Sequence, residues 1–149
     1  MPTSYAVLDS GILLATVQTE AYTQHAKTLL KRLGEQDIQF AAPTLLRYEL
    51  VAVTRKWVYR ELATPEDAET ALDTLLSYPV ELYFDEALLK RGYELATEHN
   101  RPTAYDAQYL AVAERLSCEF WSADERLFNA VKDRFTSIRW LGNVELDDK

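Results

Sequence analysis

The sequence predicts an α/β fold in which a central, mainly parallel sheet of about five strands carries helices on both faces. Short apolar runs of β-type composition alternate along the chain with longer segments whose apolar residues recur at helical spacing. Such alternation is typical of a parallel sheet. With 149 residues, 48% of them hydrophobic, the chain can bury the core of one domain, which we expect to span residues 1–149.

The elements follow one another in a regular order, beginning with the apolar run Tyr5–Leu8, which ends at Asp9. The other expected strands are Ile38–Ala41, Val80–Phe84, Glu119–Trp121 and Ile138–Trp140. The expected helices are Ala21–Gly34, Thr44–Glu61, Pro65–Ser77, Glu86–His99, Ala104–Leu116 and Asp124–Arg134. The clearest helix is Ala104–Leu116, because Tyr109, Leu110 and Ala113 recur on one side of it.

Charge and composition limit the possible functions. The net charge of -8 argues against a surface that coats nucleic acid, although a metal-dependent nuclease must itself be acidic where it holds cations. The single cysteine, Cys118, excludes an internal disulfide and fits a reducing compartment, so we expect a cytoplasmic protein. We expect no secretory signal and no membrane span. The 4 glycines form no phosphate-binding loop.

Four carboxylates stand beside apolar residues, without a cationic partner one helical turn away. Asp9 closes the first strand, Glu49 lies in the first turns of the helix after the second strand, and Asp124 follows the fourth strand. Asp106 opens the helix that leads down into the fourth strand. Because loops at the carboxyl ends of parallel strands meet at one edge, we expect the four acids to converge there. Clustered acids repel one another unless a cation joins them, and a divalent metal is the usual one.

Helix capping offers a structural explanation for two of these acids. Thr103 and Asp106 have the spacing of a capping box, with Thr103 as the N-cap. Ser122 and Glu125 match that pattern better, which would make Glu125 the capping residue and leave Asp124 free. Either acid could therefore be only a helix-start residue.

The other two acids fit a purely structural role less well. Asp9 could accept hydrogen bonds from loop amides as a buried acceptor. Glu49 has only apolar neighbours three and four positions away, so it shares a face with core residues while carrying a charge. The single histidines His25 and His99 have no partner at zinc-site spacing, and His99 near a helix end should favour the helix dipole. Four separate coincidences explain the acids less well than one shared site.

Four segments carry these acids in order, at compatible spacing: Val7–Ser10, Pro43–Leu50, Tyr105–Glu114 and Trp121–Leu127. Together they resemble the PIN-domain ribonucleases, and most closely the VapC-like toxins of toxin–antitoxin pairs. The resemblance covers nearly the whole chain. Gly11 stands where a polar residue is common, and Ser122 where threonine is common.

The resemblance implies a PIN-like α/β/α sandwich and a metal-dependent endoribonuclease, acting as the toxin of a toxin–antitoxin system. It further implies an RNA substrate, a cognate antitoxin protein and a homodimer. Carboxylate oxygens select Mg²⁺ or Mn²⁺. We expect Asp9, Asp106 and Asp124 to ligate the ion directly, and Glu49 to complete the site by ligation or by orienting the attacking water.

Two serines near the acids and two alternative classes of protein also follow from the sequence. Ser10 and Ser122 are expected to hold the carboxylates by hydrogen bonds. One alternative is a catalytically silent PIN-like module that binds RNA or protein. Another is a phosphoacceptor receiver domain, which would need a second acid beside Asp9 and a lysine after the last strand, where none occurs before Lys149. The RNA target and the number of metal ions are not encoded in any motif.

Overall fold

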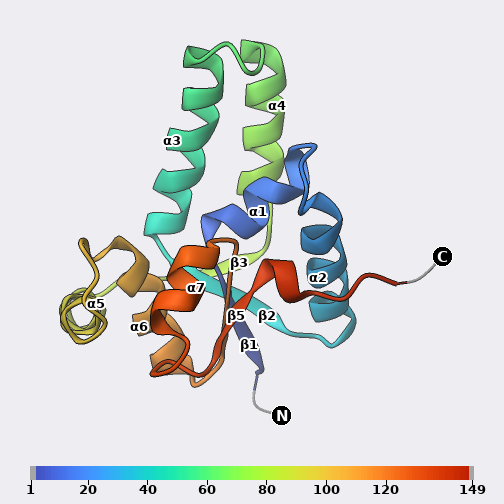
Figure 1. Ribbon diagram of the computed structural model, residues 1–149. Helices are drawn as coiled ribbons and strands as arrows, with labels where there is room; N and C mark the ends of the chain where they lie inside the picture. Colours follow the sequence, from blue (N-terminus) through green and yellow to red (C-terminus); the bar gives the residue numbers. More distant parts are fainter. Residues whose placement is uncertain (1–2, 148–149) are drawn as a thin grey trace.

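In a computed structural model that describes residues 3–147, five parallel strands form one sheet (Figure 1). The strands are β1 (Tyr5–Leu8), β2 (Gln39–Pro43), β3 (Val80–Tyr83), β4 (Glu119–Ser122) and β5 (Ile138–Trp140). Their order in the sheet is β3-β2-β1-β4-β5. The predicted fold class is therefore confirmed, and the described sheet is wholly rather than mainly parallel.

Seven α-helices and one short 3₁₀ helix connect and follow the strands within the described residues. They are α1 (Ser10–Val17), α2 (Thr23–Glu35), α3 (Leu45–Tyr59), α4 (Pro65–Leu76), α5 (Glu86–Glu98), α6 (Tyr105–Leu116), α7 (Glu125–Val131) and the 3₁₀ helix η1 (Leu141–Asn143). All six predicted helices are present, with ends that differ by a few residues. The sequence did not predict α1.

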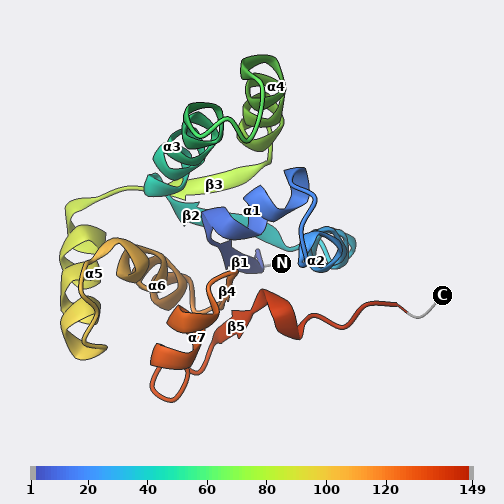
Figure 2. The same ribbon diagram turned by 45° about the horizontal axis from the view of Figure 1, so that its top comes forward.

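The helices are divided between the two faces of the sheet (Figure 2). Connections between parallel strands are right-handed, so the direction in which the chain crosses the sheet fixes the face on which each helix lies. The chain moves from β1 to β2 to β3 in one direction, which places α1 to α4 on one face. It then returns to β4 and continues to β5, which places α5, α6 and α7 on the other.

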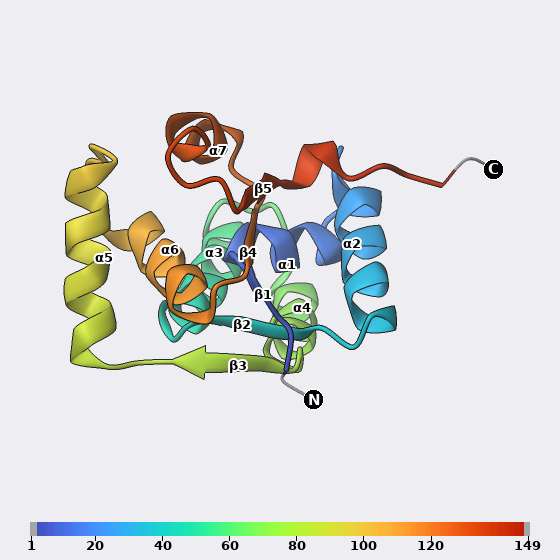
Figure 3. The same ribbon diagram turned by 90° about the horizontal axis from the view of Figure 1, so that it is seen from below.

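The core lies on both sides of β1, the central strand. Ala6, Val7 and Leu8 are all buried, as expected for a parallel strand covered on both faces. Helix α6 packs across β1, β2 and β4 and is buried from Tyr109 to Ala113. Helix α5 covers the outer side of α6, away from the sheet (Figure 3). The central strand and α6 thus form the rigid support for any site at the sheet edge.

Helices α3 and α4 pack against each other and project from the body of the domain (Figure 1). The start of α4 is fixed by local chemistry. The Thr64 hydroxyl accepts a hydrogen bond from the Asp67 amide at 3.1 Å, and Pro65 supplies a preset backbone angle at the first helical position. Several large apolar side chains on this part of the chain stay exposed, among them Tyr59 and Leu62.

Strands β1 and β4 lie side by side, yet their helices leave in opposite directions. Helix α1 follows β1 onto one face, and α7 follows β4 onto the other. In open parallel sheets, such a point leaves a crevice outside the carboxyl ends of the strands, where ligands bind. Asp9 follows β1 directly, and Asp124 lies two residues after the end of β4.

Candidate active site

All four predicted acids line one pocket of about 330 Å³ at this crevice. We call it the acid pocket. Its lining residues are Asp9, Ser10, Gly11, Glu49, Asp106, Tyr109, Phe120, Ala123, Asp124 and Leu127. Residues up to 118 positions apart in the sequence are thus brought together by the ends of β1 and β4 and by the first turns of α3 and α6.

Asp9 is both the N-cap of α1 and a wall of the acid pocket. Its carboxylate accepts hydrogen bonds from the Ile12 amide at 3.1 Å, the Ser122 hydroxyl at 2.6 Å and the Ala123 amide at 3.3 Å. Asp9 therefore does accept hydrogen bonds from loop amides, as the structural alternative predicted, and it also lines the acid pocket. Burial, with a smaller contribution from the charge of Glu49, raises the pKa of Asp9 to about 6 against the effect of these hydrogen bonds.

Glu49 is held by a hydroxyl that the sequence did not single out as functional. The Tyr109 hydroxyl donates a hydrogen bond to Glu49 Oε1, and the Tyr109 ring stacks on Phe120 with ring centroids 5.7 Å apart. Burial raises the pKa of Glu49, the hydroxyls of Tyr109 and Ser10 lower it, and the charge of Asp106 raises it. In the sequence, Tyr109 was indistinguishable from a core residue of α6. Its position three residues after Asp106 was the one available signal.

Asp106 has a cationic partner that helical spacing could not reveal. Arg101, in the segment between α5 and α6, places Nη2 3.1 Å from Asp106 Oδ2. The expected capping box is wrong, because the N-cap of α6 is Ala104 and no side chain caps the helix there. Thr103 is therefore not the N-cap, and Asp106 stands in the first turn with its carboxylate turned toward the pocket and Arg101.

Asp124 is the N-cap of α7, which corrects a second capping prediction. Its Oδ1 accepts hydrogen bonds from the amides of Arg126 at 2.9 Å and Leu127 at 3.2 Å. Glu125 lies inside the first turn and is not the capping residue. The expected role of Ser122 as a hydrogen-bonding support is seen directly, since its hydroxyl donates to Asp9 and accepts from the Asp124 amide at 3.0 Å.

Gly11 allows the two acid-bearing loops to approach each other. A Cβ atom at Gly11 would lie 2.7 Å from the Cβ of Ala123, which is closer than carbon atoms pack. The first turn of α1 can therefore rest against the β4–α7 connection only if residue 11 has no side chain. The absence of a polar residue at this position serves packing between the loops that carry Asp9 and Asp124.

The donor set of the acid pocket fits a hard divalent cation. Its candidate ligands are carboxylate oxygens, and two of the acids feel a neighbouring negative charge: Glu49 raises the pKa of Asp9, and Asp106 raises the pKa of Glu49. Within residues 3–147, however, no three His, Cys, Asp or Glu side chains are arranged so that they could jointly hold a metal ion. Mg²⁺ commonly keeps several waters and binds through one or two carboxylates, and the pocket has room for a hydrated ion.

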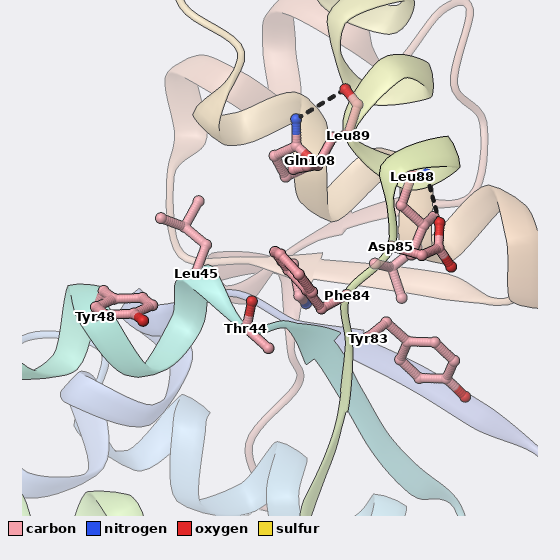
Figure 4. A pocket seen from close by; sticks show the side chains of 11 residues that line it. Thr44, Leu45, Tyr48, Tyr83, Phe84, Asp85, Leu88, Leu89 and Gln108 are labelled. Carbon is pink, nitrogen blue, oxygen red and sulfur yellow. Dashed lines mark hydrogen bonds between the residues drawn. The ribbon is translucent and has the colours of Figure 1, made fainter.

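A second, apolar depression lies on the other side of α3 and α6 (Figure 4). We call it the apolar groove. It measures about 190 Å³ and is lined by Pro43, Thr44, Leu45, Tyr48, Tyr83, Phe84, Asp85, Leu88, Leu89, Gln108 and Val112. Tyr48 and Phe84 are 74% and 72% exposed, which is unusual for aromatic side chains. The sequence did not predict this groove, which depends on how α5 packs against α6.

The remaining titratable candidates lie outside the acid pocket. His99 is the C-cap residue of α5, and burial and the charge of Arg134 lower its pKa, which disfavours the charged imidazole that would gain most from the helix dipole. Burial also raises the pKa of the Cys118 thiol, in agreement with an unreactive cysteine. None of the described helices combines the length and apolar character needed to cross a membrane.

A five-stranded parallel sheet with an acidic pocket at its switch point defines a class of nuclease-like α/β domains. The sequence profile of the PIN domain matches residues 6–133, so the chain belongs to the PIN domain family. PIN domains are generally nucleases and typically use divalent metals. The fold is similar to the crystal structure of PAE2754 from Pyrobaculum aerophilum, with 22% sequence identity over 95% of this chain and 93% of that chain and a TM-score of 0.63. No curated protein matches this chain.

Proposed function

We propose that this protein is a metal-dependent endoribonuclease that hydrolyses RNA phosphodiester bonds in the acid pocket. The observation that carries the proposal is the meeting of Asp9, Glu49, Asp106 and Asp124 around one pocket at the switch point of a PIN fold. Acids that repel one another in this way gain stability when a Mg²⁺ or Mn²⁺ ion joins them.

The chain's own groups would orient the reaction. When bound, the ion supplies a polarised water and positive charge for the scissile phosphate. The Ser122 hydroxyl and the Ala123 amide hold Asp9 in a fixed orientation, and Tyr109 holds one oxygen of Glu49. With Tyr109 and Ser10 orienting it, the Glu49 carboxylate would be placed to orient the attacking water and accept its proton.

We further propose that the protein acts in the cytoplasm as the toxin of a toxin–antitoxin pair, as the resemblance to VapC-like proteins implies. A cognate antitoxin and a homodimer are the expected protein partners. The exposed aromatic rings of Tyr48 and Phe84 support a protein contact at the apolar groove, since a polar solvent favours covering such rings. Expression of the chain alone should slow growth, and coexpression of the antitoxin should restore it.

A catalytically silent PIN-like module that binds RNA or protein is the second candidate. One observation favours it, namely that no three acids converge at a metal position in the described part of the chain. The two candidates differ in the outcome of a single experiment, because only the nuclease changes the length of its RNA.

The test is incubation of the purified protein with total RNA in EDTA, and with Mg²⁺ or Mn²⁺ restored, followed by mapping of the cut ends. Attack by a metal-activated water leaves 5′-phosphate and 3′-hydroxyl ends, which ligate without kinase treatment. We expect such ends, and no cleavage in EDTA. Cyclic 2′,3′-phosphate ends or full activity in EDTA would contradict the mechanism, and intact RNA under all conditions would favour the silent module.

A further inference from the structure

Arg101 brings a positive charge to the edge of the acid pocket. Its Nη2 lies 3.1 Å from Asp106 Oδ2, and the two side chains are only 17% and 36% exposed. Of the ion pairs formed within residues 3–147, this is the one that includes a member of the four-acid set. The other pairs lie outside the acid pocket, so Arg101 has a distinct electrostatic position.

The backbone places Arg101 at this position, and among the described residues its guanidinium donates one hydrogen bond, the one to Asp106. The Arg101 amide donates to the Ala96 carbonyl at 2.8 Å, after Asn100 has turned the chain with a left-handed φ of 50°. The Arg101 Nε is buried and has no hydrogen-bond partner among the described residues. A buried donor without a partner costs free energy, so packing alone is a poor reason to keep an arginine here.

The acids supply a better reason for the arginine. Asp106 and Glu49 line the same acid pocket, and the negative charge of Asp106 raises the pKa of Glu49. A single positive charge beside Asp106 offsets part of this repulsion when no metal ion is present. The same charge opposes the arrival of a divalent cation, because it occupies one oxygen of Asp106 and repels the ion.

We propose that Arg101 is an internal counter-ion of the acid pocket, which neutralises Asp106 in the metal-free protein and competes with the divalent metal for that carboxylate. This inference rests on the proposed metal site. Arg101 is in this sense a positioning residue, because it acts through Asp106. It stabilises the empty pocket at the expense of metal affinity, so that metal binding must weaken the Arg101–Asp106 ion pair.

The test compares Arg101→Gln with a matched control at another arginine that forms ion pairs in the same part of the chain. Arg91 joins α5 to α6 through Glu114 at 2.7 Å and also pairs with Glu98 at 3.1 Å, outside the acid pocket. Arg91→Gln therefore removes an equal charge and its ion pairs without touching the acid pocket. Arg101→Lys keeps the charge and should restore behaviour close to that of the parent.

Mn²⁺ affinity is measured by calorimetric titration, and Tm is measured in EDTA. Arg101→Gln should tighten Mn²⁺ binding on the order of fivefold to tenfold, because the competing charge is gone. It should also lower the Tm of the metal-free protein, and added Mn²⁺ should remove that difference. Arg91→Gln should lower the Tm without changing Mn²⁺ affinity.

The outcomes separate this inference from the proposed function. If the parent binds Mn²⁺ and Arg101→Gln binds it equally or more weakly, the proposed competition is overturned. The proposed metal site would then still stand. Binding by neither protein would overturn the metal site and the competition together. Binding by Arg101→Gln alone would support the competition in its strongest form. If Arg101→Gln does not fold, weakened binding in Arg101→Lys overturns the inference and parent-like binding supports it.

Discussion

The acid pocket and the apolar groove are built from the same two helices, yet they have opposite character. Helix α3 gives Glu49 to the pocket and Tyr48 to the groove, and α6 gives Tyr109 to the pocket and Gln108 to the groove. Residues adjacent in a helix point in directions about 100° apart, so one helix can serve two surfaces. The two surfaces show that one helix can place an acid in a charged pocket and an exposed aromatic ring in an apolar groove, on different sides of its axis.

The largest expected effect is a loss of RNA cleavage when the acid pocket is changed, with no such loss when the apolar groove is changed. If Asp106 ligates the ion as we propose, Asp106→Asn should reduce RNA cleavage by a factor on the order of 10³, because it removes a charged oxygen from the proposed metal site. Phe84→Ala, in the apolar groove, should leave the cleavage of RNA by the isolated protein close to the parent value. Initial rates at saturating Mg²⁺ measure both. Equal losses in the two variants would mean that the groove belongs to the catalytic site.

The second largest effect should be a pH dependence of the free energy of unfolding that arises in the acid pocket and not in the apolar groove. The pKa of Asp9 is raised to about 6 in the folded protein from an ordinary value of 3.8, so folding favours its protonated form. This contribution is fully present below pH 3.8 and is lost as the pH rises through about 6. In EDTA the loss should amount to about 3 kcal/mol at most, from the size of that shift.

Urea unfolding in EDTA at a series of pH values measures this loss, with Asp9→Asn as the reference that cannot titrate at that position. Mn²⁺ should stabilise the parent more at pH 7.5 than at pH 5, since the ion competes with protons for the carboxylates. A parent and an Asp9→Asn variant with the same pH dependence would show that Asp9 is not the titrating group.

Gly11→Ala should disturb the close contact between the start of α1 and the β4–α7 connection, beside the acid pocket. The added Cβ would lie 2.7 Å from Ala123 Cβ, so the α1 start and the β4–α7 connection must move apart. Overpacking of this kind costs about 1–3 kcal/mol, which thermal unfolding can measure. The double variant Gly11→Ala, Ala123→Gly removes the opposing atom and should regain most of the loss. No recovery would mean that the cost arises elsewhere in α1.

The smallest of these effects should come from Tyr109→Phe, which keeps the ring stacked on Phe120 but removes the hydroxyl that holds Glu49. We expect kcat to fall about tenfold with little change in KM, as for loss of a group that orients a ligand or a base. Circular dichroism would verify the fold. A kcat equal to that of the parent would show that Glu49 needs no such support.

The order of elements and the meeting of the acids could be predicted because they depend on local periodicity and on the general topology of parallel sheets. Helix α1 could not, since Ile12, Leu13, Leu14 and Ala15 are all buried and the segment shows no polar face. The partners of the acids were also missed. Arg101 approaches from a loop, and the Tyr109 hydroxyl reaches Glu49 from 60 positions away.

The capping predictions failed for a related reason. Sequence spacing identifies a helix start only to within a few residues, and the cap depends on the exact backbone angle at one position. Asp124 is the N-cap of α7 and accepts two amide hydrogen bonds there, whereas Ser122 is the last residue of β4. The apolar groove is likewise formed by tertiary packing of α5 against α6, so no single segment of the sequence encodes it.

Two of the four acids begin helices, and this decides how an inactive variant should be made. Asp9 and Asp124 each accept an amide hydrogen bond that starts a helix, so alanine at either position removes a charge and also frays α1 or α7. Asparagine is a good N-cap without the charge. A growth assay in which Asp9→Ala is harmless therefore cannot distinguish lost chemistry from a lost helix, whereas Asp9→Asn reports more directly on the charge.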